Sequence, residues 1–188
     1  MTLAHGAGAG MNHPFMKLLA EALAENDIST FRFNFPYMER KKKRPDFPAV
    51  AHKTVEAALS EAHNLFPKIP LFASGKSFGG RMSSQLVSTH SPDFVKGIIF
   101  FGFPLHPAGK PSVERAEHLK NIQVPMLFLQ GTRDTLAEWN LIEEVTQQLP
   151  STTLCKAEGA DHSFKRGKEN LIPWLAVQVH DWIKNIGH

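Results

Sequence analysis

A serine between glycines stands out among the residues that could do chemistry. The segment Gly75-Lys76-Ser77-Phe78-Gly79 has the pattern G-x-S-x-G and follows an apolar run at 69–74. A strand that turns sharply into a helix at such a serine raises its hydroxyl above a sheet, and the glycines allow the bend and the close packing. The pattern in this context predicts that Ser77 is a nucleophile that attacks a carbonyl group.

A serine nucleophile needs a base that takes its proton and an acid that orients the base. In this strand–turn–helix setting the acid follows the serine in the chain and the histidine comes last. Asp134 follows the apolar run at 126–130, and His162 follows the strand-like segment at 152–157. We therefore predict Asp134 and His162 as the partners of Ser77. Glu138 and Asp161 are alternative acids, although Asp161 is better placed to hold its own loop through backbone N–H groups.

The glycine-rich segment His5-Gly6-Ala7-Gly8-Ala9-Gly10 follows the first strand-like run. Small residues at this place let backbone N–H groups converge on the oxyanion of an acyl-transfer intermediate. We predict the N–H of Ala7 as one donor, with Gly8 as the alternative, and the N–H of Phe78 as the second. His5 is expected to tie this loop to neighbouring backbone.

Two phosphate-binding interpretations compete with this one and fit less well. A P-loop needs a glycine five positions before Gly75, where Pro70 stands. A dinucleotide fingerprint needs G-x-G-x-x-G and an acidic residue after the second strand, whereas the spacing here is G-x-G-x-G and the second strand-like run ends at Asn34 and Phe35.

Short apolar runs alternate with amphipathic segments, which indicates β–α–β units. The expected strands and helices give an α/β fold, a three-layer α/β/α sandwich with a mostly parallel open sheet of about six strands and no large lid. We expect strands at 3–5, 28–35, 69–74, 95–102, 124–130 and 152–157, and helices at 14–25, 49–66, 79–89, 136–149 and 170–186. In the longest of these helices, 49–66, Val50, Val55, Leu59 and Leu65 are expected to face inward, and 103–120 is expected to be irregular with at most a short helix.

The composition is that of an ordinary globular protein. The 188 residues, 42% hydrophobic with a formal net charge of +3, suit a single domain over 1–188 and give no reason to expect nucleic acid. No basic and apolar leader opens the sequence, no run is long enough to span a membrane, and the single cysteine fits a reducing cytoplasm. We expect no metal and no cofactor.

These motifs together resemble the α/β-hydrolase superfamily, and most of all its small bacterial dienelactone-hydrolase-like members. The combination of His-Gly-Ala-Gly-Ala-Gly, Phe-Asn-Phe-Pro-Tyr and Ser-Gly-Lys-Ser-Phe-Gly-Gly-Arg-Met is similar to bacterial relatives of the NSL-complex subunit and testis-expressed hydrolase-like subgroup. The resemblance implies a catalytic Ser77, Asp134 and His162, oxyanion donors at Ala7 and Phe78, and no cofactor. The usual leading strands are missing, so either the fold lacks them or the chain is short at its N-terminus.

The resemblance implies a serine hydrolase for a small ester-like acyl substrate, through an acyl-enzyme intermediate. A thioesterase with the same triad and a non-catalytic interaction module of the same fold are the alternatives. Tyr37, Phe103 and Lys76 are candidate substrate-binding residues, although core packing explains the aromatic ones equally well. The basic run at 40–44 is typical of a solvated loop; a rim that attracts an anionic substrate, and a contact with nucleic acid or an acidic partner, are the alternatives.

Overall fold

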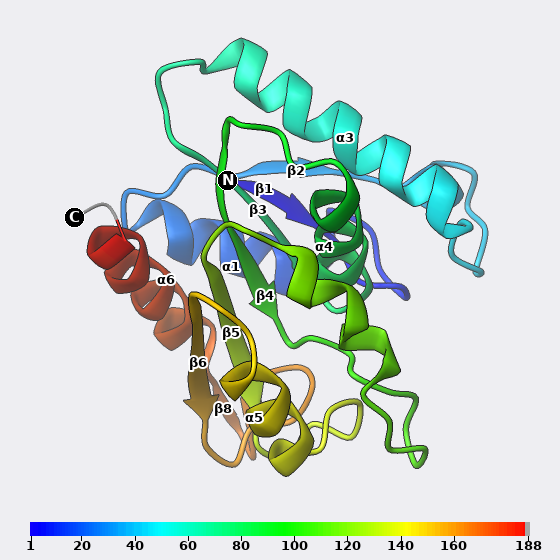
Figure 1. The fold of residues 1–188 in the computed structure, drawn as a ribbon, viewed down its shortest axis with the longest axis vertical. Coiled ribbons are helices and arrows are strands. Elements are labelled where there is room, and N and C mark those ends of the chain that lie inside the picture. The colour runs from blue at the N-terminus through cyan, green and yellow to red at the C-terminus, as the bar shows by residue number, and fades with distance from the viewer. Residues whose placement is uncertain (187–188) are drawn as a thin grey trace.

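A six-stranded parallel sheet forms the centre of the molecule. The computed structural model describes residues 1–186. The strands run in the order β2-β1-β3-β4-β5-β6 and every neighbouring pair is parallel (Figure 1). Their bounds are Thr2–Ala4 for β1, Phe31–Phe33 for β2, Leu71–Lys76 for β3, Val95–Phe101 for β4, Met126–Gly131 for β5 and Thr152–Ala157 for β6. The predicted fold class is thus confirmed.

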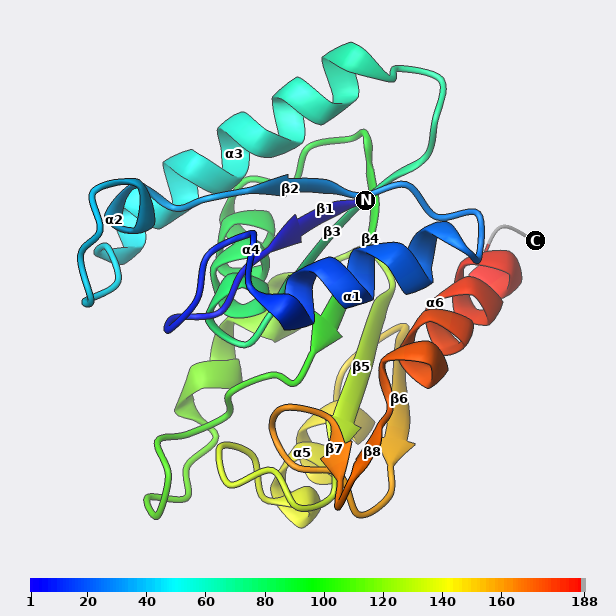
Figure 2. The same ribbon diagram turned by 180° about the vertical axis from the view of Figure 1, so that it is seen from behind.

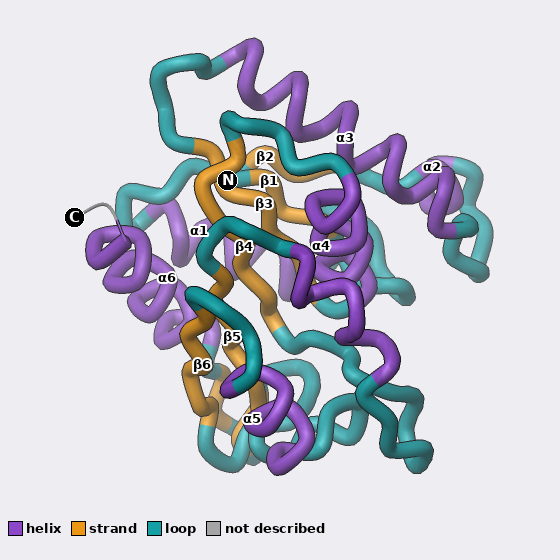
Figure 3. Tube along the Cα trace, in the orientation of Figure 1, coloured by secondary structure: helices purple, strands orange, loops and turns teal. Residues whose placement is uncertain are grey.

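Helices cover both faces of the sheet and make three layers. One face carries α1 (Pro14–Ala24) and α6 (Ile172–Ile186), which lie in front of the strands in Figure 2. The other face carries α3 (Pro48–Leu65), α4 (Phe78–Thr89), the 3-10 helix η1 (Glu114–Asn121) and α5 (Trp139–Gln147), and Figure 3 shows the strands between the two layers. Each face has its own hydrophobic core.

The burial of the strands follows from their place in the sheet. Strands β3 and β5 are buried at every position, because helices cover both of their faces. The edge strands β2 and β6 are only partly buried. Parallel strands end at one edge of the sheet, so the loops after β1, β3, β4, β5 and β6 meet there.

Several predicted boundaries need correction. Strand β2 is shorter than 28–35, because it pairs only with the three residues of β1. Helix α5 begins at Trp139 and not at Leu136, because the carboxylate of Asp134 accepts the N–H of Leu136 and holds a turn there. Two elements were missed: the short helix α2 (Pro36–Glu39) and the hairpin of β7 (Lys165–Arg166) and β8 (Glu169–Asn170).

The expected inward face of α3 is partly wrong. Val50 is 42% exposed and Leu65 is 54% exposed, whereas Val55 and Leu59 are fully buried. The buried stripe runs through small residues at helical spacing, Ala51, Ala58 and Ala62, and the two exposed side chains lie off that stripe. The irregular segment after β4 contains η1, in agreement with the prediction of a short helix there.

Candidate active site

Ser77 stands at the turn between β3 and α4. Its backbone has φ 51° and ψ −115°, a conformation that costs a non-glycine residue free energy and is kept where the surrounding structure enforces it. The turn passes close to β1: a Cβ on Gly79 would lie 2.5 Å from the carbonyl oxygen of Ala4. The glycines therefore allow the helix to approach the sheet, as the G-x-S-x-G pattern predicts.

The structure brings Asp134 and His162 together. His162 Nδ1 lies 2.6 Å from Asp134 Oδ2, and the Asp134 side chain has no exposed surface. The carboxylate comes from the turn after β5 and the imidazole from the loop after β6. A carboxylate that accepts Nδ1–H leaves Nε2 as the ring nitrogen that can accept a proton.

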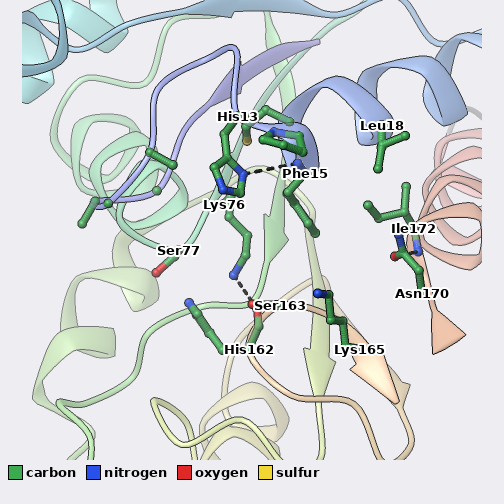
Figure 4. Close-up of a pocket in the computed structure, with 16 residues that line it drawn as sticks. His13, Phe15, Leu18, Lys76, Ser77, His162, Ser163, Lys165, Asn170 and Ile172 are labelled. Atoms are coloured by element: carbon green, nitrogen blue, oxygen red, sulfur yellow. Dashed lines mark hydrogen bonds between the residues drawn. The ribbon is translucent and has the colours of Figure 1, made fainter. Parts of the chain in front are cut away.

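His162 and Ser77 line one cavity of about 600 Å³, which we call the His162 cavity. Figure 4 shows a ring nitrogen of His162 on the side that faces the Ser77 hydroxyl. No hydrogen bond joins the two side chains within residues 1–186, and catalytic hydrogen bonds often shorten only when substrate is bound. Apolar wall residues of this cavity come from α1 and α6, among them Phe15, Leu18 and Ile172.

The predicted alternatives for the acid have other roles. Asp161 Oδ1 accepts the backbone N–H groups of Ser163 and Lys165, at 2.8 and 3.0 Å, so it holds its own loop as expected. Glu138 precedes the first residue of α5, and its N–H donates to His106 Nε2.

Hydrogen bonds from His5 and Tyr37 hold the first loop, which lines the cavity. The N–H of Phe35 donates to His5 Nε2, so His5 Nδ1 carries the ring proton and donates to the Gly6 carbonyl at 2.8 Å. Burial lowers the pKa of His5, which keeps the ring neutral. Tyr37 Oη lies 2.8 Å from the carbonyl oxygen of Ala7 and 3.3 Å from that of Gly6.

The hydrogen bonds to the Gly6 carbonyl also fix the predicted oxyanion donor, the N–H of Ala7. In a trans peptide the C=O and the following N–H point in opposite directions, so fixing the Gly6 carbonyl also fixes the N–H of Ala7. Ala7 lines the same cavity as Ser77. Phe78 is the first residue of α4, and an N–H in the first helical turn has no partner inside the helix. Both predicted donors therefore lie next to Ser77, and their role at an oxyanion stays a prediction.

The candidate substrate-binding residues lie in different places. Tyr37 and Phe103 are each 1% exposed, and neither lines the His162 cavity. Phe103 packs against Phe100 and Phe128, and Tyr37 supports the first loop. Lys76 does line the cavity, but its Nζ donates to the backbone carbonyl of His162 at 2.7 Å.

Lys76 joins the serine turn to the histidine loop. Its Nζ lies 5.8 Å from the ring centre of Phe15 and 5.6 Å from that of Phe164. Burial lowers the pKa of Lys76 to about 8, opposed by the charges of Asp134 and Asp161. Lys76, the residue before Ser77, therefore helps to place His162.

Sequence reasoning missed Gln130, which supports the acid. Its Nε2 donates to Asp134 Oδ2 at 2.6 Å, and its Oε1 accepts the N–H of Phe103 at 2.8 Å. A fully buried amide at the end of an otherwise apolar strand was the signal that could have found it. No group of three or more histidine, cysteine, aspartate or glutamate side chains in residues 1–186 is arranged to hold a metal ion.

The family assignment follows from comparison with known proteins. A family model described as an alpha/beta hydrolase domain matches residues 1–174. The chain belongs to this family. Its fold is similar to those of an α/β serine hydrolase homologue from Coxiella burnetii, with 21% identity and a TM-score of 0.71, and of dienelactone hydrolase from Anabaena variabilis, with 18% identity and a TM-score of 0.76. Both similarities cover 98% of this chain and 84% of the other.

A third similar α/β hydrolase, from Xanthomonas campestris, is described as a serine hydrolase without a lid. It is 22% identical, with a TM-score of 0.73 over 96% of this chain and 81% of the other. The connections within residues 1–186 of our α/β hydrolase likewise carry no inserted helical segment long enough for a large lid, in agreement with the prediction. No helix in that range has the length and apolar character to cross a membrane.

Proposed function

We propose that this α/β hydrolase cleaves small ester-like acyl substrates, with Ser77 as nucleophile, His162 as base and Asp134 as the orienting acid. The observation that carries the proposal is the 2.6 Å contact between His162 Nδ1 and Asp134 Oδ2, at a cavity that Ser77 also lines. A buried carboxylate paired with an imidazole beside a strained serine is the arrangement that acyl transfer needs.

The reaction would proceed in two halves. Ser77 Oγ attacks the carbonyl carbon while His162 Nε2 takes the hydroxyl proton, and the N–H groups of Ala7 and Phe78 hold the oxyanion. His162 then gives that proton to the leaving oxygen or sulfur, and the acyl group stays on Ser77. In the second half His162 takes a proton from water, the hydroxide oxygen bonds to the acyl carbon, and Ser77 recovers its proton as the acid departs.

A fluorophosphonate probe tests the nucleophile without knowledge of the substrate. We expect the probe to label the wild-type protein and not Ser77→Ala. Ser163→Ala is the matched control, because Ser163 is the other serine on the wall of the His162 cavity, and this variant should still be labelled. Absence of labelling in folded wild-type protein would favour the non-catalytic interaction module of the same fold.

Ester and thioester substrates distinguish the two hydrolase alternatives. A panel of p-nitrophenyl esters and acyl thioesters of matched acyl length would rank them by kcat/KM. Asp134→Asn should lower kcat on the better class by about 10⁴-fold, because the amide favours the wrong imidazole tautomer. An unchanged kcat in this variant would contradict the proposed triad.

The subgroup of the protein and its location in the cell stay predictions. The resemblance to the NSL-complex and testis-expressed hydrolase-like subgroup rests on the three sequence motifs. A cytoplasmic location rests on the single cysteine, Cys155.

A further inference from the structure

A second cavity opens beside Ser77, and His162 does not line it. It has a volume of about 400 Å³, and Ala7 and Ser77 line both it and the His162 cavity. Three arginines from separate segments also line it: Arg44 from the loop after α2, Arg81 from α4 and Arg115 from η1. We call it the arginine cavity.

The guanidinium groups in this cavity lack carboxylate partners. The ion pairs found within residues 1–186 involve none of these three arginines. Arg81 Nε is buried without any hydrogen-bond partner, although a buried donor left unpaired costs free energy. Arg115 Nη1 reaches only the Pro104 carbonyl, at 3.4 Å, and the guanidinium carbon of Arg44 lies 6.0 Å from the centre of the exposed Phe47 ring.

The pKa values of groups beside this cavity are consistent with its positive charge. Burial and then the charge of Arg115 lower the pKa of Arg81. Burial, followed by the charges of Arg81 and His52, lowers the pKa of His118 to about 4, so this imidazole is neutral near pH 7 and adds no charge of its own. Asp46 is the one carboxylate on the wall in the described residues, and its Oδ2 accepts the N–H of Tyr37 at 2.9 Å.

Two cavities that meet at Ser77 offer separate spaces for the leaving group and the acyl chain of an ester. His162 must deliver its proton to the leaving atom, so the leaving group belongs in the cavity that His162 lines. The acyl chain is attached to the same carbonyl carbon, and the arginine cavity is the other space that Ser77 lines. We propose that the preferred substrates carry an anionic oxygen group, a carboxylate or a phosphate-type group, at the far end of the acyl chain, bound by Arg81 and Arg115 with Arg44 at the rim.

This inference rests on the proposed hydrolase function and makes a separate prediction. The test compares p-nitrophenyl hydrogen glutarate with p-nitrophenyl methyl glutarate, which share leaving group and chain length and differ in terminal charge. Wild-type kcat/KM should favour the anionic ester by about tenfold to a hundredfold, the size expected of a charge-assisted hydrogen bond. A third ester, with a phosphonate in place of the terminal carboxylate, shows which of the two anionic groups the protein prefers.

Variants of the cavity arginines test whether the preference for the anionic ester comes from the arginine cavity. In Arg115→Gln, and in Arg81→Gln if that half-buried substitution folds, the ratio of kcat/KM for the two glutarates should fall toward one. Lys43→Gln is the matched control, because it removes one positive charge from an exposed position beside Arg44 that does not line the cavity. This control should keep the wild-type ratio.

The outcomes separate the inference from the proposed function. Ser77-dependent cleavage of both glutarates with a ratio near one overturns the inference and leaves the hydrolase intact. A preference for a carboxylate on the aromatic leaving group instead also overturns it. If no ester is cleaved, saturation-transfer NMR with Ser77→Ala compares the binding of monomethyl glutarate and dimethyl glutarate. Preferred binding of the anionic monomethyl ester that is lost when Arg115→Gln is added supports the anion site. Equal binding of the two compounds, or no binding, overturns it.

Discussion

Gln130 and His162 contact the same oxygen of Asp134, each at 2.6 Å. Because the Gln130 amide also accepts the N–H of Phe103, it is held at both ends and in turn holds the Asp134 oxygen that His162 contacts. Gln130 is therefore a positioning residue for the proposed acid and base.

The variant Gln130→Glu keeps the shape and the acceptor but places a second carboxyl group against Asp134. Two carboxylates in contact resist ionising together, so we expect kcat to fall at least about tenfold as pH rises and the introduced group loses its proton. The measurement is kcat against pH for wild type and variant. Gln130→Met is the control, because it removes both hydrogen bonds without adding charge and should lower kcat without a new pH dependence. Parallel profiles for wild type and Gln130→Glu would contradict this role.

Tyr37→Phe should release the loop that carries Ala7. The variant removes the phenolic donor from the half-buried carbonyls of Gly6 and Ala7, and the Gly6 carbonyl keeps its bond from His5, so we expect a cost of about 1 kcal/mol in the free energy of unfolding. We expect kcat to fall by about tenfold while KM changes little, since a misplaced oxyanion donor weakens only transition-state binding. Steady-state kinetics and urea unfolding check the two effects, and a loss of stability with unchanged kcat would make Tyr37 purely structural.

Gly79→Ala should disrupt the turn at Ser77. The added Cβ would lie 2.5 Å from the Ala4 carbonyl oxygen and 2.6 Å from that of His5, and both are backbone atoms of β1 and its loop. We expect a loss of at least about 2 kcal/mol in the free energy of unfolding. Gly8→Ala is the matched control, because a Cβ there meets nothing within 4 Å, and it should unfold like wild type.

Lys76 should make the stability of the fold depend on pH in the alkaline range. Burial lowers the folded-state pKa of Lys76 from 10.5 to about 8. Between these values the unfolded chain binds a proton that the folded chain has released, so the free energy of unfolding rises with pH there. The full rise is about 3 kcal/mol, since one pKa unit corresponds to about 1.4 kcal/mol.

Comparison with Lys76→Met isolates this contribution. Urea unfolding at steps from pH 8 to pH 10 should show a rise for wild type that the variant lacks. Measurements should stop near pH 10, because burial and then Asp46 raise the pKa of Tyr37 to about 12, and its ionisation in the unfolded state lowers stability above pH 10. Equal slopes for both proteins would show that the folded Lys76 keeps an ordinary pKa.

The sequence by itself determined the fold class and most of the elements that form it. Apolar runs bounded by glycine and proline predicted the parallel strands, because central strands of such a sheet are buried on both faces. Local rules also placed Ser77 at a strand-to-helix turn, and Asp134 and His162 in loops after late strands. Chain order and the sheet edge then predicted that these loops meet, and the structure brings Asp134 and His162 into contact.

Only the tertiary structure decided which side chains support and surround the site. Tyr37 and Lys76 act on groups 30 and 86 residues away in the chain, and no local spacing predicts such pairs. Gln130 is only 4 residues from Asp134, but their contact depends on how the turn after β5 folds. The arginine cavity likewise gathers side chains from three separate segments, and Arg81 and Arg115 gave no signal in the sequence. Burial and charge at a site depend on packing between distant segments, and for that reason the sequence predicted the nucleophile's turn and not the cavities on either side of it.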